Sequence, residues 1–231
     1  MIVHSEIVMT STDPAGARGY LVRPADDATH AGIVLIQEWW GIEPHVLDLA
    51  QKLAAQGFMV LVPDLYHGQV ATEPDDARKL MLLVRENVER ALAEVELALE
   101  YLRNHAQVQP KKLGLIGFCM GGFLTYKTAS RYPHLGAISP WYGGGYDPVA
   151  EDLSKVNAPV LAVYGELDGG IPAAQIQQIE AAFRTAGKDY TAKVYAGAGH
   201  AFLNNTHGSY HEAAAKDAWQ LVLDFFKLNL I

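Results

Sequence analysis

The only cysteine of the chain, Cys119, lies at the centre of a G-x-C-x-G turn. The apolar run at 113–117 predicts a buried strand before it, and a helix is expected at 121–131 after it. In the related G-x-S-x-G turn, glycines two residues to either side let strand and helix approach a strained central residue. Gly117 and Gly121 hold those positions here. The pattern predicts a nucleophile elbow that carries a thiol, whereas a lone cysteine outside such a turn is more often a small buried packing residue.

A cysteine nucleophile needs a base nearby and a third group that orients the base. His200, in a glycine-rich turn after the strand expected at 191–195, is the candidate base. Asp168, in the loop after the strand expected at 160–164, is the candidate orienting acid. The chain order of nucleophile, acid and histidine is that of the α/β-hydrolases. Glu166 in the same loop is the competing acid, but it precedes the loop apex.

Glu38 follows the first strand expected to be parallel, where the backbone commonly supplies an oxyanion donor. A carboxylate beside a thiol can accept its hydrogen bond or proton and so help to form the thiolate. The alternative is an ordinary surface acid of this loop. The predicted oxyanion donors are the backbone N–H groups of Met120 and Trp39. The helix that begins after Met120 directs its positive end toward the sulfur, which favours the thiolate.

Strands and helices are expected to alternate between these residues. Continuous apolar runs predict buried strands at 31–36, 58–62 and 113–117, and further strands are expected at 135–139, 160–164 and 191–195. The remaining expected elements are β segments at 2–9 and 19–23 joined by a turn at 13–16, and helices at 44–56, 74–104, 121–131, 173–185 and 210–226. This order predicts an α/β fold with a mostly parallel central sheet flanked by helices. Loops at the carboxyl ends of parallel strands share one edge, so the four candidate side chains are expected to meet there.

Length and charge exclude several classes of protein. The 231 residues are expected to form a single domain over 1–231, and a net charge of -8 argues against a nucleic-acid partner. The first ten residues do not resemble a secretory signal, and no apolar stretch is long enough to predict a membrane span. A single cysteine excludes an intrachain disulfide framework and a Cys-rich zinc site. We expect a cytoplasmic protein with a free thiol and no cofactor.

A metal site is the alternative use of the histidines. His207 and His211 are four residues apart, a helical metal-ligand spacing, and His200 is close to them in the chain. Gly208 and Ser209 intervene, however, and no glutamate follows His207. An exposed helix start is therefore the favoured interpretation, and no metal is predicted.

Six short motifs are spread over nearly the whole chain: Gln37-Glu38 with Gly41, Pro63-Asp64-Leu65-Tyr66, Gly117-Phe118-Cys119-Met120-Gly121-Gly122, Trp141-Tyr142-Gly143, Gly165 with Asp168, and Ala198-Gly199-His200 with Phe202. Together they resemble the dienelactone hydrolase family, the carboxymethylenebutenolidase-like members of the α/β-hydrolase fold. The resemblance implies a Cys-Asp-His triad in which the glutamate of Gln37-Glu38 holds and activates the thiol.

The resemblance also implies two arginines that bind a substrate carboxylate, one before the elbow and one shortly after the catalytic histidine. Arg78 and Arg85 are the candidates for the first. The second is absent, because residues 203–205 read Leu-Asn-Asn. Without the complete pair, an anionic lactone loses a bidentate partner.

Aromatic side chains near the expected strand ends could instead line a largely neutral pocket: Trp39, Trp40, Trp141, Tyr142 and Phe202. The alternative role of each is core packing. Adjacent tryptophans cannot both point into the same core, so at least one is expected to reach the cleft. A neutral ester or lactone is therefore favoured over a carboxylated dienelactone.

The leading hypothesis is a hydrolase that forms a covalent intermediate on Cys119 and acts on small neutral esters or lactones. Activated aryl esters and phosphotriesters are an extension, because a neutral triester also develops a negatively charged oxygen. One alternative is a true dienelactone hydrolase that acts on a carboxylated lactone. Another is a non-catalytic ligand-binding protein on the same scaffold. Monomer and homodimer both remain open.

Overall fold

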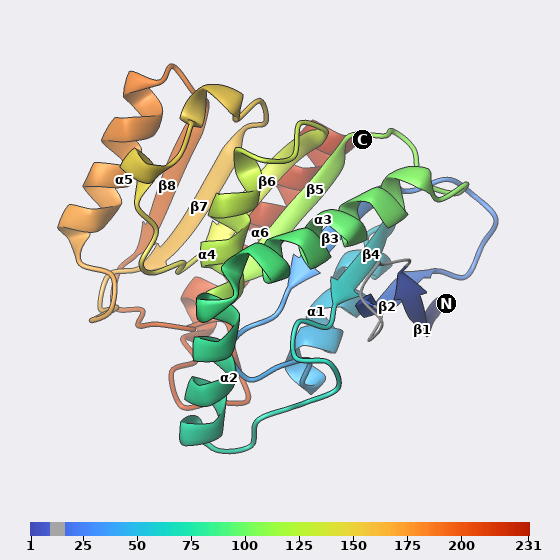
Figure 1. Cartoon of the computed structure of the whole chain (residues 1–231), viewed down its shortest axis with the longest axis horizontal. Coiled ribbons are helices and arrows are strands. Elements are labelled where there is room, and N and C mark those ends of the chain that lie inside the picture. The colour runs from blue at the N-terminus through green and yellow to red at the C-terminus, as the bar shows by residue number, and fades with distance from the viewer. Residues whose placement is uncertain (10–16) are drawn as a thin grey trace.

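The computed structural model of the chain describes residues 1–9 and 17–231. The turn predicted at 13–16 lies outside the described residues. Within them, the strands form one sheet in the order β1-β2-β4-β3-β5-β6-β7-β8 (Figure 1). The strands are β1 (Ile2–Met9), β2 (Ala17–Pro24), β3 (Ala31–Ile36), β4 (Phe58–Pro63), β5 (Leu113–Phe118), β6 (Leu135–Trp141), β7 (Val160–Gly165) and β8 (Tyr190–Tyr195).

Helices cover both faces of the sheet. Figure 1 shows α3 and α4 in front of the strands and α6 behind them. The helices are α1 (Pro44–Ala55), α2 (Pro74–Glu86), α3 (Val88–Asn104), α4 (Met120–Ala129), α5 (Ala173–Thr185) and α6 (Glu212–Leu230), with short 3₁₀ turns at Pro148–Ala150 and Leu153–Lys155. Among the described residues, no helix combines the length and the apolar character that crossing a membrane requires.

The direction of the strands decides where the loops gather. Strands β3 to β8 pair in parallel, whereas β1 and β2 are antiparallel to their neighbours. The predicted α/β fold with a mostly parallel sheet is confirmed. Because β3, β5, β7 and β8 end at the same edge, the loops that carry Glu38, Cys119, Asp168 and His200 lie together beside it.

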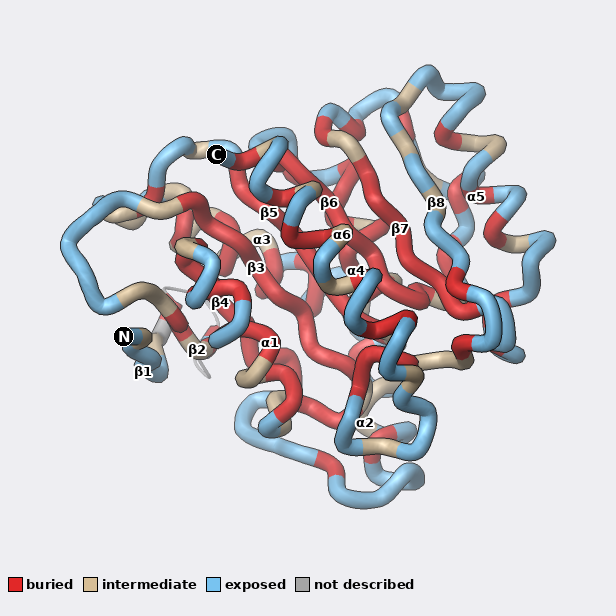
Figure 2. The backbone as a smooth tube through the Cα atoms, turned by 180° about the vertical axis from the view of Figure 1, so that it is seen from behind, coloured by how far each residue is buried: buried red, intermediate tan, exposed pale blue. Residues whose placement is uncertain are grey.

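The core lies on the central strands. Every residue of β3, β4, β5, β6 and β7 is buried, and Figure 2 shows these strands in red beneath their helices. Continuous apolar sequences suit strands that are covered on both faces. The edge strand β8 instead consists of half-buried and exposed residues before the buried Tyr195. Packing on both sides holds the carboxyl ends of the central strands rigidly.

The single helix predicted over 74–104 is wrong, because the chain leaves the helical conformation at Asn87. This residue has φ -116° and ψ 40°, and it separates α2 from α3. Its side-chain Nδ2 donates to the carbonyl oxygen of Leu83 at 2.9 Å. An asparagine side chain that binds nearby backbone competes with the helical ladder. After this break, α2 projects past the edge of the sheet at which β3 and β5 end (Figure 1).

The closing helix begins later and ends later than predicted. Helix α6 covers Glu212–Leu230 instead of 210–226. His211 is its N-cap, and the ring Nδ1 accepts the backbone N–H of Ala214 at 3.3 Å. Such a cap satisfies one of the N–H groups that the first turn leaves without a partner.

Candidate active site

The elbow around Cys119 is a tight turn between a strand and a helix. Strand β5 ends at Phe118 and α4 begins at Met120, so one residue makes the turn. Cys119 has φ 54° and ψ -112°, a strained conformation for a residue with a side chain. A Cβ on Gly117 would lie 2.3 Å from the carbonyl oxygen of Gly121. A Cβ on Gly121 would lie 2.5 Å from a backbone oxygen of β3. Only glycine at both positions allows strand and helix this close.

Hydrogen bonds from neighbouring elements hold this strained turn. The N–H of Cys119 donates to the carbonyl oxygen of Trp141 at 3.0 Å. The N–H of Phe123 donates to the carbonyl oxygen of Cys119 at 3.1 Å. Strain of this kind costs about 1–3 kcal/mol and persists only where the surroundings impose it. The thiol is half-buried, so it stays accessible at the top of α4.

His200 and Asp168 complete a chain of contacts to the sulfur. His200 Nε2 lies 3.1 Å from Cys119 Sγ. On the other side of the ring, His200 Nδ1 lies 2.6 Å from Asp168 Oδ2. The side chain of Asp168 is almost completely buried, and its Oδ1 accepts the N–H of Gly170 at 2.9 Å. The structure therefore brings the three predicted side chains together in the predicted order.

The competing acid, Glu166, points elsewhere. It is exposed, and its Oε2 accepts the backbone N–H of Gly197 at 2.9 Å. That contact braces the turn that leads to His200. Asp168 alone of the two acids reaches the imidazole.

The pKa of His200 is strongly raised, to about 10. Burial by itself lowers the pKa, because it disfavours the charged ring. The hydrogen bonds to Asp168 and Cys119, together with their negative charges, act in the opposite direction and prevail. An imidazolium held between a carboxylate and a sulfur atom favours a thiolate as its partner.

The predicted oxyanion donors lie on adjoining loops. Gly121, at the start of α4, packs against the backbone oxygens of Ile36 and Gln37, so the Trp39 loop lies next to the elbow. Within residues 1–9 and 17–231, no protein acceptor takes the N–H of Met120 or of Trp39. Both groups are free to bind a developing negative charge, and their joint role stays a prediction.

Glu38 is buried in a network of hydrogen bonds. Its Oε1 accepts the hydroxyl of Tyr142 at 3.1 Å, and its Oε2 accepts Nδ2 of Asn204 at 2.9 Å. The same Nδ2 donates to Glu43 Oε1 at 3.0 Å. Burial raises the pKa of Glu38 above its ordinary value, and the two hydrogen bonds only reduce this rise. The sulfur contacts His200 instead, and the described residues contain no hydrogen bond between Glu38 and Cys119.

Tyr142 and Asn204 make contacts with Glu38 that the sequence did not reveal. The Tyr142 ring is fully buried and packs edge-on against the imidazole of His200, with ring centroids 5.2 Å apart. Its φ of 35° is unusual for a tyrosine and directs the hydroxyl toward Glu38. Asn204 is also fully buried, in the segment where the expected second arginine is absent. That absence was the one signal in the sequence that pointed to this segment.

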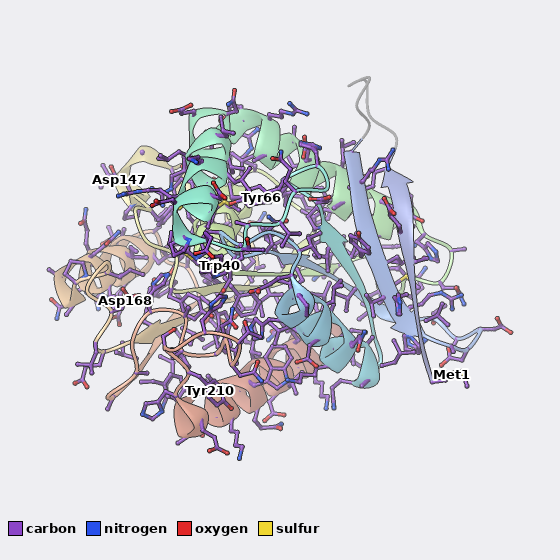
Figure 3. All side chains as sticks on the ribbon, turned by 90° about the horizontal axis from the view of Figure 1, so that it is seen from below. Met1, Trp40, Tyr66, Asp147, Asp168 and Tyr210 are labelled. Atoms are coloured by element: carbon purple, nitrogen blue, oxygen red, sulfur yellow. The ribbon has the colours of Figure 1, made fainter. Side chains whose placement is uncertain are left out.

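The predicted aromatic pocket is only partly supported. Trp141, Tyr142 and Phe202 are completely buried, and Trp141 Nε1 donates to Ser139 Oγ at 2.9 Å. Core residues of this kind expose no surface to a ligand, so their predicted contact with substrate has no support here. Trp39 is half-buried at the edge of the site. Figure 3 looks onto this edge and labels Trp40, Tyr66 and Asp168 on it.

The two candidate arginines lie on α2. Arg85 donates through Nη2 to the carbonyl oxygen of Gly144 at 3.1 Å, and its guanidinium lies 4.9 Å from the ring centroid of Phe123. It therefore braces the loop that follows Tyr142. Arg78 is exposed on the same helix.

The histidines considered for a metal site have other contacts. His207 stacks on Trp40 with ring centroids 4.3 Å apart, and its Nε2 lies 3.7 Å from Glu43 Oε2. His211 caps α6. In the described part of the chain, no group of three His, Cys, Asp or Glu side chains is placed to hold a metal ion.

Burial of Glu38 predicts a pH dependence of stability. The pKa of Glu38 is raised above 4.5 in the folded protein. Its contribution to stability is therefore fully present below pH 4.5 and is lost as the pH rises through the raised pKa. Each unit of the rise corresponds to about 1.4 kcal/mol. Because Glu38→Gln cannot titrate, the Tm of the wild type minus that of the variant should fall as the pH rises.

Thermal unfolding from about pH 4 to about pH 8 measures this difference. Glu180→Gln, on the exposed side of α5, is the control and should give a flat difference. A flat difference for Glu38→Gln would mean that Glu38 is not held in a desolvated environment.

Known proteins resemble this chain over almost its full length. Residues 17–230 match the sequence profile of the Dienelactone hydrolase family. A protein of Aquifex aeolicus (strain VF5) named "Putative carboxymethylenebutenolidase" is 33% identical over 227 residues, which cover 92% of this chain and 94% of that protein. The crystal structure of a "Putative Dienelactone Hydrolase" from Klebsiella pneumoniae has a TM-score of 0.87 at 29% identity and covers 98% of this chain and 99% of that one.

A further likeness is one of fold alone. A dienelactone hydrolase-like promiscuous phosphotriesterase from metagenomic libraries has a TM-score of 0.91 at 20% identity, over 100% of this chain and 99% of that one. The α/β-hydrolase fold predicted from the sequence motifs is confirmed.

Proposed function

The chain belongs to the dienelactone hydrolase family of ester and lactone hydrolases, and we propose that it uses Cys119 as a nucleophile to hydrolyse small neutral esters and lactones. The observation that carries this proposal is the continuous chain of contacts from sulfur to imidazole at 3.1 Å and from imidazole to carboxylate at 2.6 Å. A nucleophile, a base and a group that orients the base are the parts that acyl transfer through a covalent intermediate requires.

Acylation consumes the thiol and releases the alcohol. His200 Nε2 takes the proton of Cys119, and the sulfur attacks the acyl carbon of the substrate. A C–S bond forms, and the carbonyl oxygen becomes an oxyanion that the N–H groups of Met120 and Trp39 are placed to bind. The C–O bond to the leaving group then breaks, and His200 returns its proton to the departing alcohol or enol. A thioester on Cys119 remains.

Deacylation depends on a fall in the pKa of His200. In the free enzyme, the hydrogen bond and the charge of Cys119 help to raise the pKa of the imidazole to about 10. Acylation removes both of these effects, so the pKa of His200 falls in the thioester. The neutral ring can then take a proton from water, and the hydroxide that forms attacks the thioester carbon. The C–S bond breaks, the acid leaves, and the thiolate is regenerated beside an imidazolium.

Charges around the triad favour a neutral substrate. Glu38 and Asp168 are buried carboxyl groups close to His200. Within the described residues, none of the hydrogen bonds or ion pairs of the triad involves an arginine or a lysine. Asn204, in the segment where an arginine was expected, donates to two glutamates and brings no positive charge. A substrate carboxylate would therefore meet negative charge without the bidentate partner that usually compensates it.

A carboxylated lactone is the second candidate substrate. It is supported by the relative from Aquifex aeolicus, whose name refers to carboxymethylenebutenolidase. Arg85, on α2 and in contact with the loop after Tyr142, is the cation that could serve such a substrate, at the cost of its present bond to Gly144. A neutral aryl phosphotriester is a third substrate to test, because attack on phosphorus also develops an oxyanion.

A panel of substrates decides between these candidates. We expect kcat/KM for short p-nitrophenyl esters to exceed that for cis- and trans-dienelactone by about tenfold or more. The reason is that the site offers no fixed cation near the sulfur to bind the carboxylate of a dienelactone. Steady-state rates with each substrate, including a neutral aryl phosphotriester, give the comparison. Preference for dienelactone would contradict the proposed substrate class but leave the nucleophile unchanged.

Arginine variants make the comparison sharper. Arg85→Gln should have little effect on a neutral ester and should lower the rate only for a carboxylated substrate. Arg78→Gln, exposed on the same helix, is the matched control. A protein that hydrolyses none of the panel and leaves Cys119 unreactive toward iodoacetamide would support the non-catalytic alternative.

A further inference from the structure

Tyr66 belongs to a motif that the mechanism above does not use, Pro63-Asp64-Leu65-Tyr66. Its backbone is fixed by the preceding aspartate, because Asp64 Oδ1 accepts the N–H of Tyr66 at 3.1 Å. The other oxygen, Oδ2, accepts the N–H of Gly68 at 2.6 Å. Asp64 thus closes a tight turn after β4, with φ of 52° at His67. The turn presents the Tyr66 side chain to the interior, where the residue is 2% exposed.

The Tyr66 hydroxyl contacts two residues from two other loops. It donates to the carbonyl oxygen of Trp39 at 3.0 Å. It also lies 3.4 Å from Met120 Sδ, a weaker acceptor for the same proton. Trp39 follows β3 and Met120 follows the elbow of β5, so one oxygen atom joins the two loops that carry the proposed oxyanion donors. Figure 3 shows Tyr66 on the edge of the sheet where these loops meet.

We propose that Tyr66 is a positioning residue that fixes the backbones of Trp39 and Met120 relative to each other, so that their N–H groups point at the same oxyanion. This inference rests on the proposed function. Tyr66 binds each residue through an atom that does not donate, the carbonyl of one and the thioether of the other. Both N–H groups therefore remain free for the reaction.

Alignment of the donors has a large effect on rate. Loss of one oxyanion donor costs about 10²–10³ in rate, because the donors work only when they are already aimed at the developing charge. The Trp39 side chain is half-buried, and Trp39 itself lies in a loop outside helix and strand. Without the bond from Tyr66, the carbonyl of Trp39 would lose the contact that joins it to the elbow.

Tyr66 belongs to the apolar core and also lies beside a cavity. The cavity, of about 250 Å³, lies between the turn after β4 and helices α2 and α3. Leu80, Val84 and Ala91 line the apolar part of this cavity. The contacts of the hydroxyl with Trp39 and Met120 add a directional constraint to the packing of Tyr66.

The hydroxyl keeps its proton throughout the working range of the enzyme. Burial raises the pKa of Tyr66 well above its ordinary value, and the negative charge of Cys119 raises it further. Tyr66 is therefore a permanent donor and does not take part in proton transfer.

Tyr66→Phe tests the inference, because it removes only the hydroxyl. We expect kcat for a p-nitrophenyl ester to fall about 10- to 100-fold, with KM changed by less than about twofold. Inhibition by a trifluoromethyl ketone, which forms a tetrahedral oxyanion adduct with the sulfur, should weaken by a similar factor. Alkylation of Cys119 by iodoacetamide should keep its rate, because displacement of iodide creates no oxyanion. Tyr132→Phe, whose hydroxyl binds Glu100 away from the site, is the matched control and should change none of these values.

Each outcome of this experiment has a definite meaning. Unchanged ester turnover in Tyr66→Phe would overturn the inference. A loss of iodoacetamide reactivity equal to the loss of turnover would also overturn it, since Tyr66 would then support the triad or the fold as a whole. Failure of the proposed function would look different: wild-type protein without ester turnover, or with a Cys119 that iodoacetamide does not modify.

Discussion

Replacing Cys119 with alanine is expected to lower kcat/KM for a neutral aryl ester by about 10⁴-fold or more. The sulfur is the only proposed atom that can form the acyl intermediate, and without it His200 could act only on water. The fold should survive, because the side chain is half-buried and alanine meets the same backbone strain at φ 54°. Steady-state turnover of p-nitrophenyl esters measures the first effect, and Tm measures the second.

Two further measurements identify the nucleophile. Cys119→Ser should also have a low kcat/KM for p-nitrophenyl esters, because an alkoxide is much harder to form than a thiolate beside the same imidazole. Iodoacetamide should inactivate the wild type, because the sulfur is half-buried and lies 3.1 Å from its proposed base, His200. An alanine variant that retains more than a few per cent of the wild-type activity would remove Cys119 from the mechanism.

The triad could be predicted because its determinants are local. A Cβ on Gly117 would lie 2.3 Å from the backbone of the elbow itself, and a Cβ on Gly121 would lie 2.5 Å from the backbone of the adjacent strand β3. Asp168 follows β7, whose apolar run is evident in the sequence, and His200 follows the edge strand β8. A parallel sheet then brings these loops to one edge whatever the detail of the loops. Local patterns and one topological rule were therefore sufficient.

The surroundings of Glu38 could not be predicted in the same way. Its two donors, Tyr142 and Asn204, are 104 and 166 residues away in the chain. Whether these donors reach Glu38 depends on the exact course of three loops. One of these loops has a positive φ at Tyr142, which the sequence does not predict. Composition likewise could not separate the half-buried Trp39 from Trp141, which lies wholly in the core. Tertiary packing decided both.

Replacing Asp168 with asparagine is expected to lower kcat by about 10³–10⁴-fold. The carboxylate serves two donors at once, the N–H of Gly170 at 2.9 Å and Nδ1 of His200 at 2.6 Å. An asparagine that keeps its oxygen on Gly170 turns its NH₂ group toward the ring. His200 must then accept at Nδ1 and carry its proton on Nε2, facing the sulfur, where it cannot act as a base.

Glu166→Gln is the matched control, since it changes the same chemical group two residues away. Glu166 braces Gly197 and does not contact the imidazole, so its variant should keep kcat within about threefold. KM should be little changed in both variants, because neither acid is placed to touch substrate.

A separate readout comes from the pH at which His200 titrates. Asp168 contributes to the raised pKa of His200, so the profile of iodoacetamide reactivity in Asp168→Asn should place that pKa below about 10. Equal losses in the two variants would show that the loop matters for folding, whereas a loss in Glu166→Gln alone would transfer the role of the acid to Glu166.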